Sequence, residues 1–247
     1  MKIIPVIDIL NNITVHAIKG NRQKYQPLKS ALTTSINPIE IATVFKSQGF
    51  SNLYIADLDA ILGKTPNFNL YTQLAHMGFT LMIDAGVTNI DTIKKLKNCG
   101  TSKIIIGTET LTNTNLIKEA IEQIGTEHII VSLDMKTNKI LTHPRFNGST
   151  ELFKLIKTFR NIGVSEFILL DLSRVGSNEG VNIELLKQTL TILNDVDGGG
   201  VYVGGGARGV DDLLTLKPLG VLGVLLATAL HLGKIDSNVL GQMGLLF

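Results

Sequence analysis

The sequence contains no tryptophan, a single cysteine and no long run of basic residues. One cysteine, Cys99, cannot form a disulfide within the chain, which favours a reducing compartment and predicts a cytoplasmic protein. Aromatic residues make up only 5% of the chain and the net charge is +2, so we expect no nucleic-acid partner. The longest apolar stretch, residues 221–232, is too short to span a bilayer, and we expect no membrane association.

Eight short runs rich in isoleucine, valine and leucine are spread over the 247 residues. Their apolar residues are mostly continuous rather than alternating, which is typical of parallel strands covered on both faces. A length near 250 residues suits one α/β barrel. The predicted strands are Ile3–Ile7, Asn52–Ala56, Thr80–Ile83, Lys103–Ile106, His128–Leu133, Glu166–Leu170, Val201–Val203 and Gly223–Leu226.

Segments with helical spacing of apolar residues lie between these strands. Asn182 and the pair Thr150-Glu151 precede two of them and predict capped helix starts. The alternation of strand and helix predicts a closed barrel or a doubly wound sheet. The clearest predicted helices are Ile39–Lys46, Ile90–Lys97, Asn115–Ile124, Glu151–Arg160, Asn182–Leu193 and Val210–Lys217.

An internal repeat decides between these two architectures. Residues 4–8 resemble 130–134, and residues 84–87 (Asp-Ala-Gly-Val) resemble 204–207 (Gly-Gly-Gly-Ala). Four units recur in the same order in each half, which predicts two half-barrels closing into one (β/α)8 TIM barrel over residues 1–247. The longest irregular region, 11–35, follows the first strand and therefore falls at the end of the barrel where catalytic loops gather.

Six segments together resemble the HisA/HisF family of histidine biosynthesis, and most closely its HisA isomerase branch. They span nearly the whole chain in the family's order. In sequence they are residues 5–8 (Pro-Val-Ile-Asp), 56–59 (Ala-Asp-Leu-Asp), 105–108 (Ile-Ile-Gly-Thr), 131–134 (Val-Ser-Leu-Asp), 171–174 (Asp-Leu-Ser-Arg) and 204–206 (Gly-Gly-Gly).

The resemblance implies an Amadori rearrangement, in which an aminoaldose becomes an aminoketose without a cofactor. An acid protonates the ring oxygen, and a base removes the proton from C2. The family pattern makes Asp8 the base and Asp134 the acid. Because they end the first and fifth strands of eight, these aspartates would face one ligand from opposite sides.

The resemblance also implies a phosphorylated small-molecule substrate with a phosphate at each end. Glycine loops supply backbone N–H groups to such phosphates. The candidate residues of the second half are Gly204, Gly205, Gly206, Ala227, Thr228, Gly176 and Ser177, and those of the first half are Gly86, Gly107 and Thr108. The predicted substrate-binding set also includes Asp171 and two residues of the basic loop 19–25, Gly20 and Arg22. The Arg22 guanidinium is suited to a bidentate contact with a phosphate or a carboxylate.

The chain departs from the isomerase pattern at several loops. Residues 143–146 (His-Pro-Arg-Phe) stand where the isomerase has its covering tryptophan, and Thr88 stands where it has an arginine. Residues 174–177 (Arg-Val-Gly-Ser) replace Arg-Asp-Gly-Thr, Ala227 replaces a glycine, and residues 15–17 (Val-His-Ala) replace Val-Arg-Leu. These changes resemble HisA paralogues of archaea and of C1-metabolising bacteria.

Three hypotheses follow. The first is the histidine-pathway isomerase, and the second is a paralogue acting on another phosphorylated substrate in coenzyme or C1 metabolism. The third is a non-catalytic barrel that binds a phosphorylated ligand or a partner. Its apolar end 245–247 is a candidate interface, although helix packing at the bottom of the barrel is the favoured use of these residues. The five histidines are scattered without a ligand spacing, so no metal site is expected. A homo-oligomer is compatible with all three.

Overall fold

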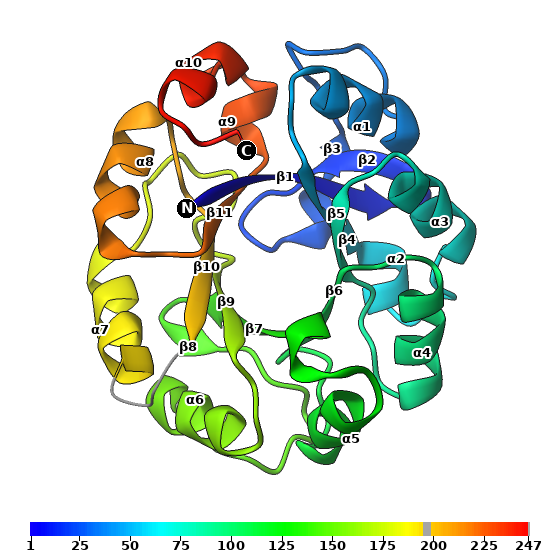
Figure 1. Cartoon of the computed structure of the whole chain (residues 1–247), viewed down its shortest axis with the longest axis vertical. Coiled ribbons are helices and arrows are strands. Elements are labelled where there is room, and N and C mark those ends of the chain that lie inside the picture. Colours follow the sequence, from blue (N-terminus) through cyan, green and yellow to red (C-terminus); the bar gives the residue numbers. More distant parts are fainter. Residues whose placement is uncertain (195–198, 247) are drawn as a thin grey trace.

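Eight parallel strands close into a barrel in the computed structural model, which describes residues 1–194 and 199–246 (Figure 1). The strands follow one another around the ring in chain order, and the last pairs with the first. They are β1 (Lys2–Leu10), β4 (Asn52–Asp57), β5 (Thr80–Asp84), β6 (Lys103–Gly107), β7 (Ile129–Lys136), β9 (Glu166–Asp171), β10 (Gly200–Gly204) and β11 (Gly223–Leu226). The predicted (β/α)8 barrel is therefore confirmed, with strand ends shifted by a few residues.

Helices surround this ring (Figure 1). They are α1 (Pro38–Ser47), α2 (Leu58–Ile61), α3 (Phe68–His76), α4 (Ile90–Asn98), α5 (Asn115–Ile124), α6 (Leu152–Asn161), α7 (Ile183–Asn194), α8 (Val210–Leu216), α9 (Thr228–His231) and α10 (Ser237–Gln242). Three short 3-10 helices complete the set, η1 (Arg22–Lys24), η2 (Thr126–His128) and η3 (Lys217–Leu219).

The capping predictions have different outcomes. The side chain of Asn182 accepts a hydrogen bond from the Leu185 N–H at 3.2 Å, as expected of a cap. The prediction for Thr150-Glu151 is wrong, because Glu151 occupies the N-cap of α6 without a side-chain capping bond. The hydroxyl of Ser149 accepts a hydrogen bond from the Glu151 N–H at 3.1 Å, so a local turn takes the place of the cap at this helix start.

Two apolar layers explain the continuous hydrophobic strands. Side chains that point outward pack under the helices, and side chains that point inward fill the barrel. The inner layer contains Ile4, Tyr54, Met82, Ile105, Ile130, Ile168, Tyr202 and Leu225, all less than 9% exposed. This packing makes the barrel interior a solid core, so a ligand is received only at the mouth.

The region 11–35 is only partly irregular, because it contains two short strands and a 3-10 turn that the sequence did not predict, whereas residues 28–35 have no regular structure. β2 (Ile13–His16) turns back antiparallel to β1, and β3 (Gln26–Pro27) pairs with β2. Asn11 and Asn12 have φ values of 54° and 61°, the left-handed conformation that a two-residue hairpin of the I′ type requires. A second such hairpin joins β7 to β8 (Lys139–Ile140) through Thr137 and Asn138. Both hairpins project from strands that carry a predicted catalytic aspartate.

The C-terminal end packs against the barrel rather than standing free. Leu245 is buried, and Leu246 packs against the main core, whereas Phe247 lies outside the described residues. An interface role for Leu245 is therefore wrong, since its side chain is already covered. Within residues 1–194 and 199–246, no helix has the length and apolar character needed to cross a bilayer.

Candidate active site

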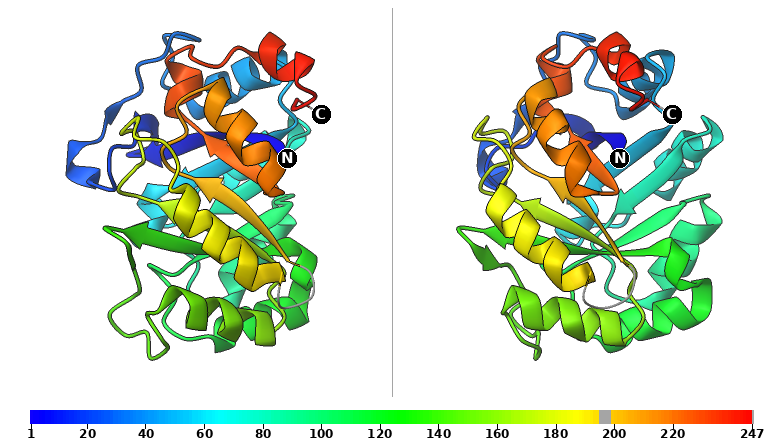
Figure 2. Two further views of the ribbon diagram at one scale, coloured as in Figure 1. Left: turned by 90° about the vertical axis from the view of Figure 1, so that its left-hand side faces the viewer. Right: turned by 60° about the vertical axis from the view of Figure 1, so that its left-hand side comes forward.

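The loops that follow the strands gather at the carboxyl end of the barrel (Figure 2, left-hand view, left side). Residues of these loops and strand ends line a cavity. Residues from every part of the chain line it, including Asp8, Arg22, Asp84 and Asp134 from the first five barrel strands and their loops. The glycines after β10 and Thr228 line the other side. This is the end of the barrel at which TIM-barrel enzymes carry their catalytic groups.

Asp8 and Asp134 occupy opposite strands of the ring. Asp8 lies on β1 and Asp134 on β7, which are four strands apart in a barrel of eight. The hydroxyl of Ser132 donates a hydrogen bond to Asp134 Oδ1 at 2.6 Å, and the Glu109 N–H approaches Oδ2 at 3.4 Å. Burial raises the pKa of Asp8 to about 7. Burial and the neighbouring Asp84 raise the pKa of Asp134 to about 7. Both carboxyls therefore titrate near neutral pH.

Asp84 adds a third buried carboxyl to the same mouth. It ends β5, is 8% exposed, and accepts a hydrogen bond from the Gly86 N–H at 3.1 Å. Burial and the charges of Glu109 and Asp57 raise the pKa of Asp84 to about 6. Burial and the Asp84 carboxylate likewise raise the pKa of Tyr54 well above its ordinary value, so Tyr54 stays a neutral hydroxyl at the floor of the cavity.

An ion pair spans one side of the mouth. Arg22, from the segment after β2, donates to both carboxylate oxygens of Glu109, at 3.0 and 2.6 Å. Tyr25 lies beside this pair and also lines the cavity. Burial and the nearby Asp8 raise the pKa of Tyr25 to about 12. The structure thus places Arg22 at the mouth as predicted, with its guanidinium engaged by Glu109.

The residues predicted to bind phosphate in the second half mostly line one wall, here named the second rim (Gly205, Gly206, Ala227 and Thr228). Gly205 and Gly206 have φ values of 92° and 99°, and a Cβ on Gly205 would lie 2.3 Å from the Asp171 carbonyl oxygen. Glycine is therefore required at Gly205 for the chain to turn into the mouth. Gly176 and Gly20 also line the cavity.

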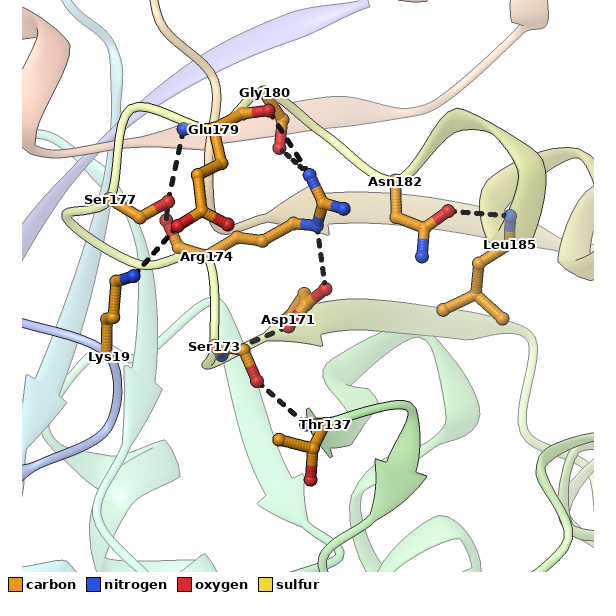
Figure 3. Close-up of polar contacts among 10 residues, drawn as sticks. All are labelled: Lys19, Thr137, Asp171, Ser173, Arg174, Ser177, Glu179, Gly180, Asn182 and Leu185. Carbon is orange, nitrogen blue, oxygen red and sulfur yellow. Dashed lines mark hydrogen bonds and ion pairs between the residues drawn. The ribbon is translucent and has the colours of Figure 1, made fainter.

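The loop between β9 and α7 is held in place by Arg174 (Figure 3). Its guanidinium pairs with Asp171 at 3.2 Å and donates to the Gly180 carbonyl oxygen at 2.9 Å. The Ser177 hydroxyl is turned into the same loop, donating to the Arg174 carbonyl and accepting from the Glu179 N–H. Asp171 and Ser177 are not among the residues lining the cavity. Their observed contacts shape the loop.

The three predicted first-half residues define the first rim (Gly86, Gly107 and Thr108). Thr108 is 1% exposed, and its hydroxyl accepts a hydrogen bond from the Asp134 N–H at 3.2 Å. A Cβ on Gly107 would lie 3.0 Å from Asp134 Oδ2, so glycine leaves room for the carboxylate. Gly86 lines a second hollow, on the outer side of Arg22 and Glu109, together with Thr88 and His143.

The polar cavity residues that were not predicted as site residues from the sequence include Asp84, Glu109, Tyr54 and Lys136. Asp84 carried a signal, since it directly follows an apolar run in the sequence, as Asp8 and Asp134 do. In the structure Asp84 ends β5, whereas β1 and β7 continue two residues beyond Asp8 and Asp134. Glu109 gave none, because its role depends on Arg22, far away in the chain. His16, in contrast, does not line the cavity. Its Nε2 lies 3.5 Å from the Thr228 hydroxyl, and burial lowers its pKa.

Comparison with known proteins identifies the family to which this chain belongs. The model of the histidine biosynthesis protein family matches residues 2–236. An uncharacterized protein of Methanocaldococcus jannaschii is 39% identical over 99% of this chain and 100% of its own length.

Two relatives carry the name 1-(5-phosphoribosyl)-5-((5-phosphoribosylamino)methylideneamino)imidazole-4-carboxamide isomerase. The one from Methanosphaera stadtmanae is 32% identical over 95% of this chain and 96% of its own. The one from Pelagibacter ubique is 32% identical over 95% of both chains. The chain described here therefore belongs to the histidine biosynthesis protein family.

Proposed function

We propose that this protein is an isomerase that converts a phosphorylated aminoaldose into an aminoketose, with Asp8 and Asp134 as its acid–base pair. The observation that carries the proposal is the placement of these two carboxyls on opposite strands of one cavity, each with its pKa raised to about 7. A pair with such pKa values holds one proton between its members near neutral pH, as acid–base catalysis requires.

Each aspartate has surroundings suited to one role. Asp134 lies beside the Asp84 carboxylate, whose negative charge favours the protonated acid. In the proposed reaction Asp134 gives its proton to the ring oxygen, and the sugar opens to an iminium ion. Asp8 then removes the proton from C2, which leaves an enolamine. Protonation at C1 and loss of the proton from the C2 hydroxyl then give the aminoketose, so atoms and electrons balance without an oxidant or a reductant.

The second rim supplies the proposed phosphate contacts. The backbone at Gly205 and Gly206 turns into the mouth, and Thr228 lines the same space. Oriented backbone N–H groups in such turns suit an anion. Gly20 and Gly176 bring the two neighbouring loops close to this wall.

A second candidate keeps the chemistry and changes the substrate. The isomerases among the relatives are named for a compound with two phosphoribosyl groups. Here Asp84 and the Arg22–Glu109 pair occupy part of the mouth, and Thr88 and His143 stand where the isomerase pattern has arginine and tryptophan. These differences favour a paralogue with another phosphorylated substrate.

Exchange of the C2 proton with deuterated solvent tests the proposal, because it reports proton removal directly. The purified protein is incubated with the histidine-pathway ribotide and, separately, with N-substituted ribosylamine 5-phosphates, and followed by proton NMR. We expect Asp8→Asn and Asp134→Asn each to lower exchange by about 10²–10⁴-fold. Asp59→Asn is the matched control, since Asp59 is buried near the same rim but is held by Lys64 at 2.7 Å outside the cavity. Exchange that survives both active-site variants would exclude the acid–base pair.

A further inference from the structure

The two rims of the mouth differ in their capacity for phosphate. In sequence, residues 84–86 (Asp-Ala-Gly) correspond to residues 204–206 (Gly-Gly-Gly). In the structure this difference removes a donor from the first rim, because the Asp84 carboxylate accepts a hydrogen bond from the Gly86 N–H at 3.1 Å. The Thr108 N–H donates to the Ser132 carbonyl at 2.9 Å, and the Glu109 N–H points at Asp134. Three backbone donors of the first rim, the N–H groups of Gly86, Thr108 and Glu109, are therefore already used.

The second rim keeps its donors. Among residues 1–194 and 199–246, no acceptor takes a hydrogen bond from the backbone N–H of Gly205, Gly206 or Thr228. The carboxylates of the adjoining loop are each paired with a cation, Asp171 with Arg174 and Glu179 with Lys19. An anion at this wall would meet open N–H groups and neutralised carboxylates.

The charges beside the two rims also disfavour phosphate at the first rim. Asp84 and Asp134 both approach Gly107: a Cβ there would lie 3.7 Å from one and 3.0 Å from the other. Arg22, the cation beside them, is already bound through two hydrogen bonds to Glu109. Lys64, on the outer side, is bound to Asp59. A phosphate at the first rim would therefore lie against carboxylates in a partly water-excluded site, where like charges repel strongly.

We infer that Asp84 and Glu109 are specificity-determining residues that exclude phosphate from the first rim. The substrate then carries one phosphate, at the second rim, and its other end is an uncharged or cationic group that donates hydrogen bonds, such as an amine or hydroxyls. This inference rests on the proposed function for the identity of the site. It makes this barrel selective for a monophosphorylated aminosugar over a compound phosphorylated at both ends.

Binding of inorganic phosphate, measured by isothermal titration calorimetry, tests the inference without any turnover. Thr228→Asp puts a negative charge at the second rim, at the first position of α9, where aspartate is favourable for the helix. We expect this variant to weaken phosphate binding by at least about tenfold. Thr191→Asp adds the same charge at an exposed position of α7 that does not line the cavity, so this control should bind phosphate as the unmodified protein does.

The first rim is then tested by further substitutions in the Thr228→Asp variant. Adding Asp84→Gly and Glu109→Gln to Thr228→Asp frees the Gly86 N–H and removes two charges, so phosphate binding should return by about tenfold. Should Asp84→Gly fail to fold, Asp84→Asn with Glu109→Gln removes the same charges and should also restore binding. Full phosphate affinity in Thr228→Asp alone, or no recovery in the folded combined variant, would overturn the inference.

The outcomes separate this inference from the proposed function. Selective phosphate binding without C2 exchange on any phosphorylated aminosugar would leave the inference standing and remove the isomerase. Exchange on the ribotide with two phosphoribosyl groups, lost in Asp8→Asn, would support the isomerase and overturn the single-phosphate inference.

Discussion

Arg22 and Glu109 are 87 residues apart in the chain, yet the guanidinium of one holds both carboxylate oxygens of the other. This pair ties the segment after the β1–β2 hairpin to the loop after β6, so it links two walls of the mouth. Their side chains are 26% and 34% exposed, which leaves the pair partly shielded from water and salt. The mouth therefore has a defined width on this side.

A double-mutant cycle measures what this ion pair contributes. Arg22→Ala, Glu109→Ala and the double variant are compared by urea unfolding, and we expect a coupling free energy of about 0.5–1 kcal/mol that falls in high salt. Lys154 and Glu151 form the matched control, because their side chains are each 67% exposed and their coupling should be smaller. Equal couplings in the two cycles would show that the position of Arg22 and Glu109 at the mouth adds nothing.

The pH dependence of turnover follows from the aspartate pair. Because the pKa values of Asp8 and Asp134 are both raised to about 7, the rate should be highest near neutral pH and fall on either side. Ser132→Ala removes a hydrogen bond that lowers the pKa of Asp134, so the falling limb at high pH, where the acid loses its proton, should move to higher pH. Steady-state rates from pH 5 to 9 decide this. A profile that is flat through neutrality contradicts the assignment.

Asp84 makes the folded protein less stable at high pH. Its pKa is about 6 in the folded chain against an ordinary 3.8, so the folded state binds the proton more tightly, and stability is lost as the pH rises from about 4 to 6. Asp84→Asn removes this loss. We expect the variant to gain on the order of 2 kcal/mol over the parent in the free energy of unfolding at pH 8, relative to pH 4.

Asp59→Asn serves as a control of opposite sign. Burial raises the pKa of Asp59, but hydrogen bonds from Lys64 and Asn12 outweigh it and lower the net value. Its ionised form therefore stabilises the fold, and this contribution is lost only as the pH falls through the folded pKa. Urea unfolding at both pH values should show Asp59→Asn less stable than the parent at pH 8. A gain in stability there would contradict the reasoning for both aspartates.

Position 205 requires glycine for two reasons: its left-handed backbone conformation and the lack of space for a Cβ atom. Gly205 and Gly63 have nearly equal φ values, 92° and 93°, but a Cβ on Gly205 would meet the Asp171 carbonyl, whereas one on Gly63 meets open space. Gly63→Ala should cost about 1 kcal/mol of stability, the strain of the left-handed backbone alone. Gly205→Ala should cost clearly more and disturb the second rim. Equal losses in urea unfolding would mean that the contact relaxes freely.

The sequence by itself determined the architecture of this protein. Continuous apolar strands alternating with amphipathic helices specify a parallel sheet covered on both faces. Successive residues of each strand point alternately into the barrel and under the helices, so both kinds of position are apolar and the apolar run is unbroken. The placement of Asp8 and Asp134 four strands apart followed from chain order alone, because neighbouring strands of the closed ring follow one another along the chain.

Only the tertiary structure decided how the mouth is built. Loops from distant parts of the chain approach one another across the ring. The spacing of apolar residues in the sequence does not show which of their side chains then meet. The ion pair between Arg22 and Glu109 is of this kind. Ser177 and the Gly86 N–H have local partners, Arg174 and Asp84, but only the folded loops show that these contacts form. The pKa values of the aspartates belong here too, since burial and neighbouring charge set them, and both arise only when the barrel closes.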